Sequence, residues 1–416
     1  MSLFKPIHHT FGPHVNMRTL CHCDLIASVP WRWKRGDSRK ILREKLAQRF
    51  QGEATLFATG REALCALLRS LDLKSGEEVM VQGYTCVVVP NAIHAAGGVP
   101  VYVDIDRDTL NLDPEAVEAT ITNRTRAVIC QHTFGIPAET QRLKEICNKH
   151  NLILIEDCAH VIPDRNDPEA IAKYGDFLLF SLGRDKAISG ITGGVLISRK
   201  PEASAKLKDE EKNSTDLSFW KIGRLINYPW IYYFARPFYG IVLGKAFLVL
   251  TRKIGLLVPI LSDDEKEDGK MPLLLHRLPN ACAYLALQSF KRLSEINDHR
   301  RTLTRFYLEE GRKNGWPLLS GVTENLPLQK FPLFVRNADG IRAKLKKKNI
   351  HLNDGWTGCV VCPPGINLDA LNYTPGSDPE AEAACEQILS LPTHPTMTMR
   401  QAKILVQTLD LLLKGR

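Results

Sequence analysis

The chain has 416 residues, of which 44% are hydrophobic and 24% are charged, and its formal net charge is +9 at pH 7. This is the composition of an ordinary globular protein, and the length predicts two lobes rather than a single core. The positive charge suits a phosphorylated small molecule or a membrane surface, but no basic stripe with interleaved aromatic residues is present, so we expect no nucleic-acid partner.

Residues 1–54 form an N-terminal segment in which we expect no signal peptide. The start, "MSLFKPIHHTFGP", has no charged region, no apolar run and no cleavage site. The cysteines number eleven and are scattered through apparent core positions, which favours a reducing, cytoplasmic location. The pairs Cys21 with Cys23 and Cys359 with Cys362 lack the spacing of a paired zinc knuckle, so we expect no metal site.

Residues 55–200 alternate short apolar runs with amphipathic stretches. The strand-like runs include "EVMVQ", "PVYVDI", "AVICQH", "LILIED" and "FLLFSL", and helical stretches such as "REALCALLRSL" lie between several of them. Apolar strands that alternate with helices indicate a mostly parallel sheet that helices cover on both faces. We therefore predict an α/β domain with its site at the carboxyl ends of the strands.

Residues 201–270 interrupt this pattern with a charged stretch and then an apolar, aromatic and basic segment, residues 218–261. An apolar run of about eighteen residues is missing because Arg236, Pro237 and Lys245 break it, so we expect no transmembrane helix. One interpretation is an interfacial helix that touches the inner membrane face, with Trp220 and Trp230 at headgroup level. The interpretation that we favour is a helical insert buried against the body or a second subunit.

Residues 271–416 begin with a long helical pattern, "NACAYLALQSFKRLSEINDHRRTLTRFYLEEG", and then mix short strands with helices. We expect a helix and a smaller α+β lobe there. The loop "NDGWTGCVVCPP" is the candidate for the substrate side, where Asp354 and Trp356 would contact a base or a sugar. The alternative is that this loop is simply packed.

Three features stand at predicted strand ends. In "ATGREAL", Thr59 and Gly60 open a helix whose free N–H groups form an anion site. In "LILIEDCAH", a buried strand ends at Asp157, and a buried carboxylate needs a partner. In "FSLGRDKAISGITGG", Ser181 precedes Lys186, and a desolvated lysine can form a Schiff base. Pyridoxal phosphate would use all three, through its phosphate, its pyridine nitrogen and its aldehyde.

A resemblance to a known family is carried by five blocks: "GYTCVVVPNAI", "PVYVDIDRDTLNLDPEAVEATITNRTRAVICQHTFGIPA", "LILIEDCAH", "FSLGRDK" and "ILSLPTHP". With them the chain resembles the DegT/DnrJ family of nucleotide-sugar aminotransferases, and only residues 218–270 look foreign to it. The resemblance implies fold type I of the pyridoxal-phosphate enzymes. It also implies a homodimer with its sites at the subunit boundary.

The resemblance gives each site residue a role. Lys186 would bind the cofactor's aldehyde and later move the proton during amino transfer. Asp157 would bind the pyridine nitrogen, and His160 would touch the phenolic oxygen of the ring. The phosphate would be held at two strand ends, by Ser181, Thr59 and the N–H groups of Gly60 and Arg61. The side chain of Arg61 would add a charge-assisted contact.

Several positions depart from the family's pattern. Cys86 stands where an aromatic side chain commonly stacks on the cofactor, so that contact must come from Tyr84 or be absent. Ala187 and Thr192 replace the usual Asn and Glu, and an asparagine that crosses the dimer to the phosphate is missing near "LLLHRL". Lys186 itself is kept, which favours transamination because related dehydratases have histidine there.

The predicted function is transfer of an amino group, from L-glutamate, to a keto-sugar on a nucleotide diphosphate, for polysaccharide or glycoconjugate biosynthesis. Two alternatives stay open. One is a pyridoxal-phosphate-dependent sugar dehydratase or epimerase. The other is a non-catalytic protein that binds pyridoxal phosphate as a regulator or membrane scaffold.

Overall fold

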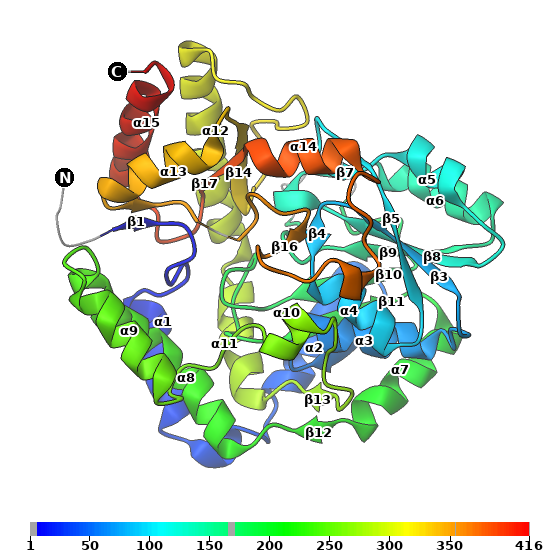
Figure 1. Ribbon diagram of the computed structural model, residues 1–416. Helices are drawn as coiled ribbons and strands as arrows, with labels where there is room; N and C mark the ends of the chain where they lie inside the picture. The colour runs from blue at the N-terminus through cyan, green and yellow to red at the C-terminus, as the bar shows by residue number, and fades with distance from the viewer. Residues whose placement is uncertain (1–5, 165–170, 354, 416) are drawn as a thin grey trace.

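The computed structural model describes residues 6–164, 171–353 and 355–415. A nine-stranded sheet crosses the larger lobe (Figure 1). Its strands, in order across the sheet, are β12 (Thr215–Asp216), β13 (His276–Arg277), β2 (Glu53–Phe57), β11 (Gly194–Ser198), β10 (Phe177–Ser181), β9 (Ile153–Asp157), β8 (Thr125–Gln131), β3 (Glu78–Gln82) and β5 (Val99–Val103). Strands β10, β9, β8, β3 and β5 are parallel, whereas β11 is antiparallel to both of its neighbours. The predicted mostly parallel sheet is confirmed.

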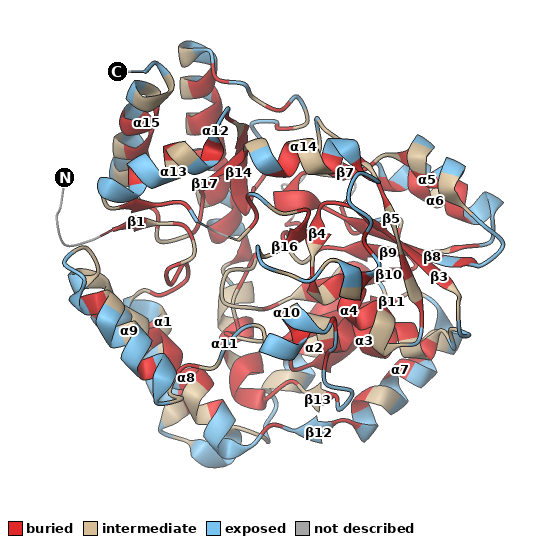
Figure 2. Cartoon of the chain, viewed as in Figure 1, coloured by how far each residue is buried: buried red, intermediate tan, exposed pale blue. Residues whose placement is uncertain are grey.

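Both faces of the sheet are buried by helices. Successive side chains of a strand point to opposite faces, so each strand contributes to both cores. In β3, Val79 and Val81 belong to the apolar cluster of one face, and Met80 belongs to that of the other. The first face is covered by α3 (Gly60–Ser70), α4 (Val88–Ala95) and α7 (Pro201–Asn213). The second face is covered by α5 (Pro114–Thr120), α6 (Thr140–Lys149), α1 (Met17–Ala27), α2 (Ser38–Phe50) and α11 (Asn280–Phe290). The strands are accordingly buried along most of their length (Figure 2).

A smaller lobe follows the long helix α12 (Leu293–Asn314). It holds the antiparallel pair β14 (Lys330–Phe334) and β17 (Ile388–Pro392). The helices of this lobe are α13 (Ala338–Lys347), α14 (Pro379–Gln387) and α15 (Met399–Leu413). Their apolar residues form one core with the strands, in which Leu333, Leu389 and Leu405 are fully buried. The expected α+β lobe is therefore present.

Short strand pairs connect distant parts of the chain. The N-terminal strand β1 (Ile7–His8) pairs with β15 (Ile350–His351) of the smaller lobe. Strand β4 (Thr85–Cys86) of the larger lobe pairs with β16 (Val361–Cys362). A third pair, β6 (Ile105–Asp106) with β7 (Asn111–Leu112), is local. Backbone hydrogen bonds thus join the two lobes beside β4.

The segment that interrupts the sequence pattern forms a helical hairpin at the edge of the molecule (Figure 1). Helix α8 (Phe219–Ala235) begins at Ser218, whose side chain accepts the N–H of Lys221, and packs its inner side on α1. Helix α9 (Leu243–Lys253) packs on α8, and the short α10 (Asp263–Glu267) follows. Among the described residues, no helix combines the length and the apolar character that crossing a membrane requires.

Candidate active site

The three sequence features meet at one edge of the sheet, where the parallel strands end. Asp157 is the last residue of β9 and Ser181 the last of β10, and the register pairs Asp157 with Leu179 of β10. Ser181 pairs with Gly194 of β11, and Gly194 in turn pairs with Phe57 at the end of β2. The carboxyl ends of such strands are the usual place for a ligand.

The first turn of α3 forms an anion cradle against the end of β10. Thr59 is the N-cap, and its side chain accepts the N–H of Glu62. The N–H groups of Gly60 and Arg61 belong to the turn that lacks intrahelical acceptors. A Cβ added at Gly60 would lie 3.4 Å from the Ser181 hydroxyl, so the glycine keeps this space open. The cradle has the N–H donors and the room that a phosphate needs.

Asp157 supplies a buried carboxylate beside this cradle. Its Oδ1 accepts the N–H of Ala159 at 2.9 Å. Burial raises the pKa of Asp157, and the Ala159 N–H and the positive charge of Lys186 partly oppose that rise. The carboxylate therefore gains from any further cation or N–H donor that enters the site.

Lys186 lies on the loop after β10, and its backbone is held by distant segments. Its carbonyl oxygen accepts hydrogen bonds from His14 Nε2 at 2.8 Å and from Arg300 Nη2 at 3.2 Å. The Nε2 of Gln329 donates to the carbonyl of the preceding residue, Asp185. These supports come from the N-terminal segment, α12 and the smaller lobe. No local sequence signal marks them, so the sequence did not predict them.

His160 lies across the site on the loop after β9. Its Nδ1 accepts the N–H of Phe134 at 3.1 Å, so a neutral ring carries its proton on Nε2. Burial and the charges of Lys186 and Lys330 lower the pKa of His160 well below its ordinary value. His160 is thus a neutral hydrogen-bond donor at physiological pH.

The predicted contact of Tyr84 with a cofactor ring is not supported. Tyr84 is 0% exposed, and its hydroxyl donates to the carbonyl of Trp356 at 2.6 Å. Its ring packs edge-on against Phe134 and Trp356, in the core that joins the lobes. Cys86 is the half-buried residue of β4 near the site: burial raises the pKa of its thiol and the charge of Lys186 lowers it. The packing of Tyr84 favours the alternative in which no aromatic side chain of β4 or its approach stacks on the ring.

The predicted side-chain contact of Arg61 with a phosphate is also corrected. The Arg61 Nε lies 2.9 Å from Oε1 of the buried Glu265, and its Nη1 donates to the carbonyl of Ile260 at 2.8 Å. The guanidinium therefore binds the segment that follows the hairpin. The backbone N–H of Arg61 stays in the first turn of α3, at the cradle.

The residues that depart from the family pattern have structural contacts. The Thr192 hydroxyl donates to the carbonyl of Ala58, and Ala187 is buried in the apolar cluster under α11. In the loop after β15, Trp356 is buried, and its ring lies 4.9 Å from that of His160. The loop is thus packed at this residue, while Asp354 lies outside the described residues.

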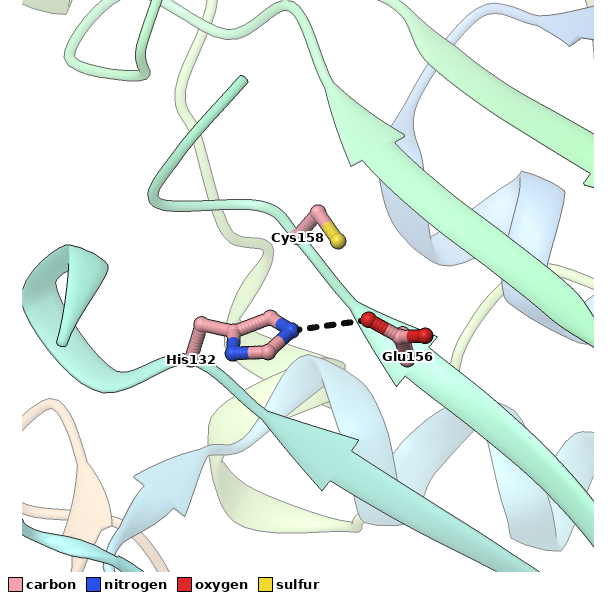
Figure 3. Close-up of side chains that lie close together, drawn as sticks. All are labelled: His132, Glu156 and Cys158. Carbon is pink, nitrogen blue, oxygen red and sulfur yellow. Dashed lines mark hydrogen bonds and ion pairs between the residues drawn. The ribbon is translucent and has the colours of Figure 1, made fainter. Parts of the chain in front are cut away.

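Within the described parts of the chain, one group of three side chains has the ligand types of a metal site: His132, Glu156 and Cys158 (Figure 3). The ligand atoms of His132 and Glu156 already have hydrogen-bond partners, which disfavours metal binding. His132 Nδ1 accepts the N–H of Ala138, so its Nε2 carries the proton that it shares with Glu156 at 3.1 Å. The Glu156 carboxylate also accepts backbone N–H groups, those of Ala172, Tyr174 and Gly175. The group fastens β8 to β9.

The cysteine pairs noted in the sequence differ from each other. Cys21 is exposed and Cys23 is buried on α1, so their sulfur atoms do not converge. The Sγ atoms of Cys359 and Cys362 lie 3.6 Å apart beside β16. Neither pair brings a third ligand of the metal-binding types together with it among the described residues.

Comparisons with known proteins agree with this arrangement. The sequence matches the DegT/DnrJ/EryC1/StrS aminotransferase family over residues 28–219 and 260–410, and the gap between these ranges contains most of the α8–α9 hairpin. The L-glutamine:2-deoxy-scyllo-inosose aminotransferase of Streptomyces kanamyceticus is 33% identical over 151 residues, 36% of this chain and 35% of that protein. GDP-perosamine synthase of Vibrio cholerae is 26% identical over 257 residues, 62% of this chain and 58% of that protein.

Both alignments cover less than two thirds of the relative's length. The crystal structure of NtdA from Bacillus subtilis with bound cofactor PMP has a TM-score of 0.74 at 19% identity, over 97% of this chain and 83% of that chain. This likeness confirms the predicted fold type I. The family match confirms the predicted family. Since that match covers well over half of the chain, the protein belongs to the DegT/DnrJ/EryC1/StrS aminotransferase family.

Proposed function

We propose that the protein is a pyridoxal-phosphate-dependent aminotransferase that moves an amino group from L-glutamate to a keto-sugar carried on a nucleotide diphosphate. The observation that carries this proposal is the meeting of Lys186, Asp157 and the cradle of Gly60 and Ser181 at one edge of the sheet. The product would serve polysaccharide or glycoconjugate biosynthesis.

The residues present fit the cofactor. A Cβ at Gly60 would fill the space in front of the Ser181 hydroxyl, and the first-turn N–H groups of α3 suit a phosphate. Asp157 offers a buried carboxylate to a pyridine nitrogen. Burial raises the pKa of this carboxyl group, so its charged form is stabilised by a proton or a cation placed beside it. Pyridoxal phosphate, when bound, supplies an electron sink for the α-carbon of an amino donor.

Each site residue would then have a defined task. Asp157 would hold the proton on the pyridine nitrogen, because its carboxylate is stabilised by a positive charge beside it. His160 would donate a hydrogen bond from Nε2–H to the phenolic oxygen. The Lys186 amine would move the proton of the donor's α-carbon, as a general base and then a general acid. The hydrogen bonds of His14 and Arg300 to the Lys186 carbonyl hold this loop in position.

Two observations support the choice of substrates. The net charge of +9 suits a diphosphate, although many ligands share that charge. GDP-perosamine synthase acts, by its name, in making a nucleotide-linked amino sugar, and another relative is named for L-glutamine as donor. We therefore include L-glutamine beside L-glutamate in the test.

We also propose a cytoplasmic homodimer with sites at the subunit boundary.

The experiment is to incubate the cofactor-loaded enzyme with isotope-labelled L-glutamate or L-glutamine and a panel of nucleotide-diphosphate keto-sugars. Mass spectrometry would then detect label in the sugar and the matching keto acid. A deoxygenated or epimerised sugar without label would instead support the dehydratase or epimerase. Absence of any conversion, with normal cofactor binding, would support the regulator.

A further inference from the structure

The hairpin of α8 and α9 has an unusual charge. Residues 218–261 contain no acidic residue. They contain the basic residues Lys221, Arg224, Arg236, Lys245, Arg252 and Lys253. Lys221, Arg252 and Lys253 are exposed, and they lie where α8 begins and α9 ends.

The outer side of the hairpin is also apolar. Leu243, Phe247, Leu250 and Ile254 follow one another at spacings of four, three and four residues, so they share one face of α9 and its end. All four are exposed, Leu243 at 64% and Ile254 at 60%. On α8, Trp220 is 68% exposed. The opposite side of α8 is buried on α1 and α9 packs on α8, so the hairpin is attached to the body through α8 while much of α9 is exposed (Figure 2).

The positive charge continues past the base of the hairpin. Phe219 packs against Trp33 and lies under the Lys34 ammonium, and Arg39 donates to the Lys34 carbonyl. Beyond Arg39 lies an open cavity of about 460 Å³. Its basic lining residues are Arg39, Lys40, Arg43, Lys208, Lys212 and Arg277. Ion pairs neutralise part of this charge: Arg43 pairs with Glu211, Arg39 and Arg277 pair with Asp216, and Lys208 pairs with Glu53.

We propose that the α8–α9 hairpin docks on an anionic phospholipid bilayer, with its apolar stripe at the level of the acyl chains and its basic side chains at the headgroup phosphates. A helical element with an apolar stripe, an exposed tryptophan and basic residues around them has the composition of an interfacial element. Neither helix is long enough to cross the bilayer. A second copy of the chain is a poorer partner on the axis of a two-fold dimer, because the basic hairpin would there face its own copy.

The test uses the full-length, cofactor-loaded protein and flotation with vesicles of phosphatidylcholine, with and without phosphatidylglycerol. We expect flotation only with the anionic vesicles. The triple variant Lys221→Glu/Arg252→Glu/Lys253→Glu should bind them at least about 100-fold more weakly. Each basic residue near such a surface strengthens the binding by about fivefold.

A matched control changes the same total charge elsewhere. Arg305→Glu/Lys313→Glu/Lys403→Glu alters exposed residues of α12 and α15, and this variant should float like the unchanged protein. A second variant, Leu243→Ser/Phe247→Ser/Leu250→Ser, keeps the charge but removes most of the apolar stripe. Because high salt screens the attraction between charges, the binding that remains at high salt depends on this stripe and should be lost in the variant. Thermal unfolding of each variant checks that it is folded.

Two results would overturn the proposal. One is that the unchanged protein does not float with anionic vesicles. The other is that both charge variants lose binding equally, which would show a general effect of net charge. If the hairpin variants instead dissociate a dimer in sedimentation experiments while vesicles are not bound, the stripe is a subunit interface. Because these readouts do not involve sugar amination, they are independent of the proposed activity.

Discussion

The imidazole of His14 donates a hydrogen bond of 2.8 Å from Nε2 to the carbonyl oxygen of Lys186, and so links the N-terminal segment to the loop of the candidate catalytic lysine. Burial lowers the pKa of His14 to about 4. An unfolded chain would protonate this ring near its ordinary value of about 6.5. The folded protein is thus more stable when His14 is neutral, above pH 6.5, and loses this stability as the pH falls toward 4.

The variant His14→Gln keeps an N–H donor but cannot titrate. Between pH 7 and pH 5 it should lose about 2 kcal/mol less free energy of unfolding than the unchanged protein, because the unfolded chain no longer gains that proton. Denaturant unfolding at the two pH values measures this difference. Other buried histidines titrate alike in both proteins and cancel. An equal loss in both proteins would show that His14 is not the group concerned.

Gly60→Ala tests the phosphate cradle. The added methyl would lie 3.4 Å from the Ser181 hydroxyl, which is ordinary contact, so the fold should keep its stability. A phosphate would lose room and a hydrogen bond, so the affinity for pyridoxal phosphate should fall about 10-fold to 100-fold. Titration with pyridoxal, which has no phosphate, is the control and should change little. Equal losses for both ligands would contradict a phosphate site at Gly60.

Asp157→Asn tests the buried carboxylate. The amide cannot keep a proton on the pyridine nitrogen, so single-turnover reaction with L-glutamate should slow about 100-fold or more. The neighbour Glu156 gives the matched comparison. The Glu156 carboxylate accepts hydrogen bonds from three backbone N–H groups and from His132. Glu156→Gln should therefore lower the free energy of unfolding by about 2 kcal/mol, while the reaction rate of the folded fraction stays close to normal. A reversal of these two effects would contradict the assignment.

The pair of Arg61 and Glu265 tests a correction to the sequence-based prediction. Since the guanidinium binds Glu265 and the Ile260 carbonyl, Arg61→Met should destabilise the protein by about 1–3 kcal/mol and change the affinity for pyridoxal phosphate less than about threefold. Glu265→Gln should destabilise it similarly, and the double variant should cost less than the sum. A tenfold loss of cofactor affinity in Arg61→Met would restore the original prediction.

Much of the site was predictable because its residues follow local rules. Asp157 and Ser181 end apolar strands and Thr59 opens a helix, so the parallel sheet brings them together. The supports of the Lys186 loop were not predictable, because His14 and Arg300 lie more than one hundred residues away from it. The contacts of Tyr84 and Arg61 were not predictable for the same reason. Their partners, Trp356 and Glu265, come from segments whose placement depends on the tertiary fold.

The most direct test of the account is the visible absorption spectrum of the purified protein with pyridoxal phosphate, before and after L-glutamate, beside Lys186→Ala. We predict a visible band from the lysine-bound cofactor that disappears on adding the donor and that is absent or shifted in the variant. Loss of the band with L-glutamine alone would keep the enzyme class and change the donor. A protein that shows no such band, or a variant with the same band and the same response, would contradict the role of Lys186.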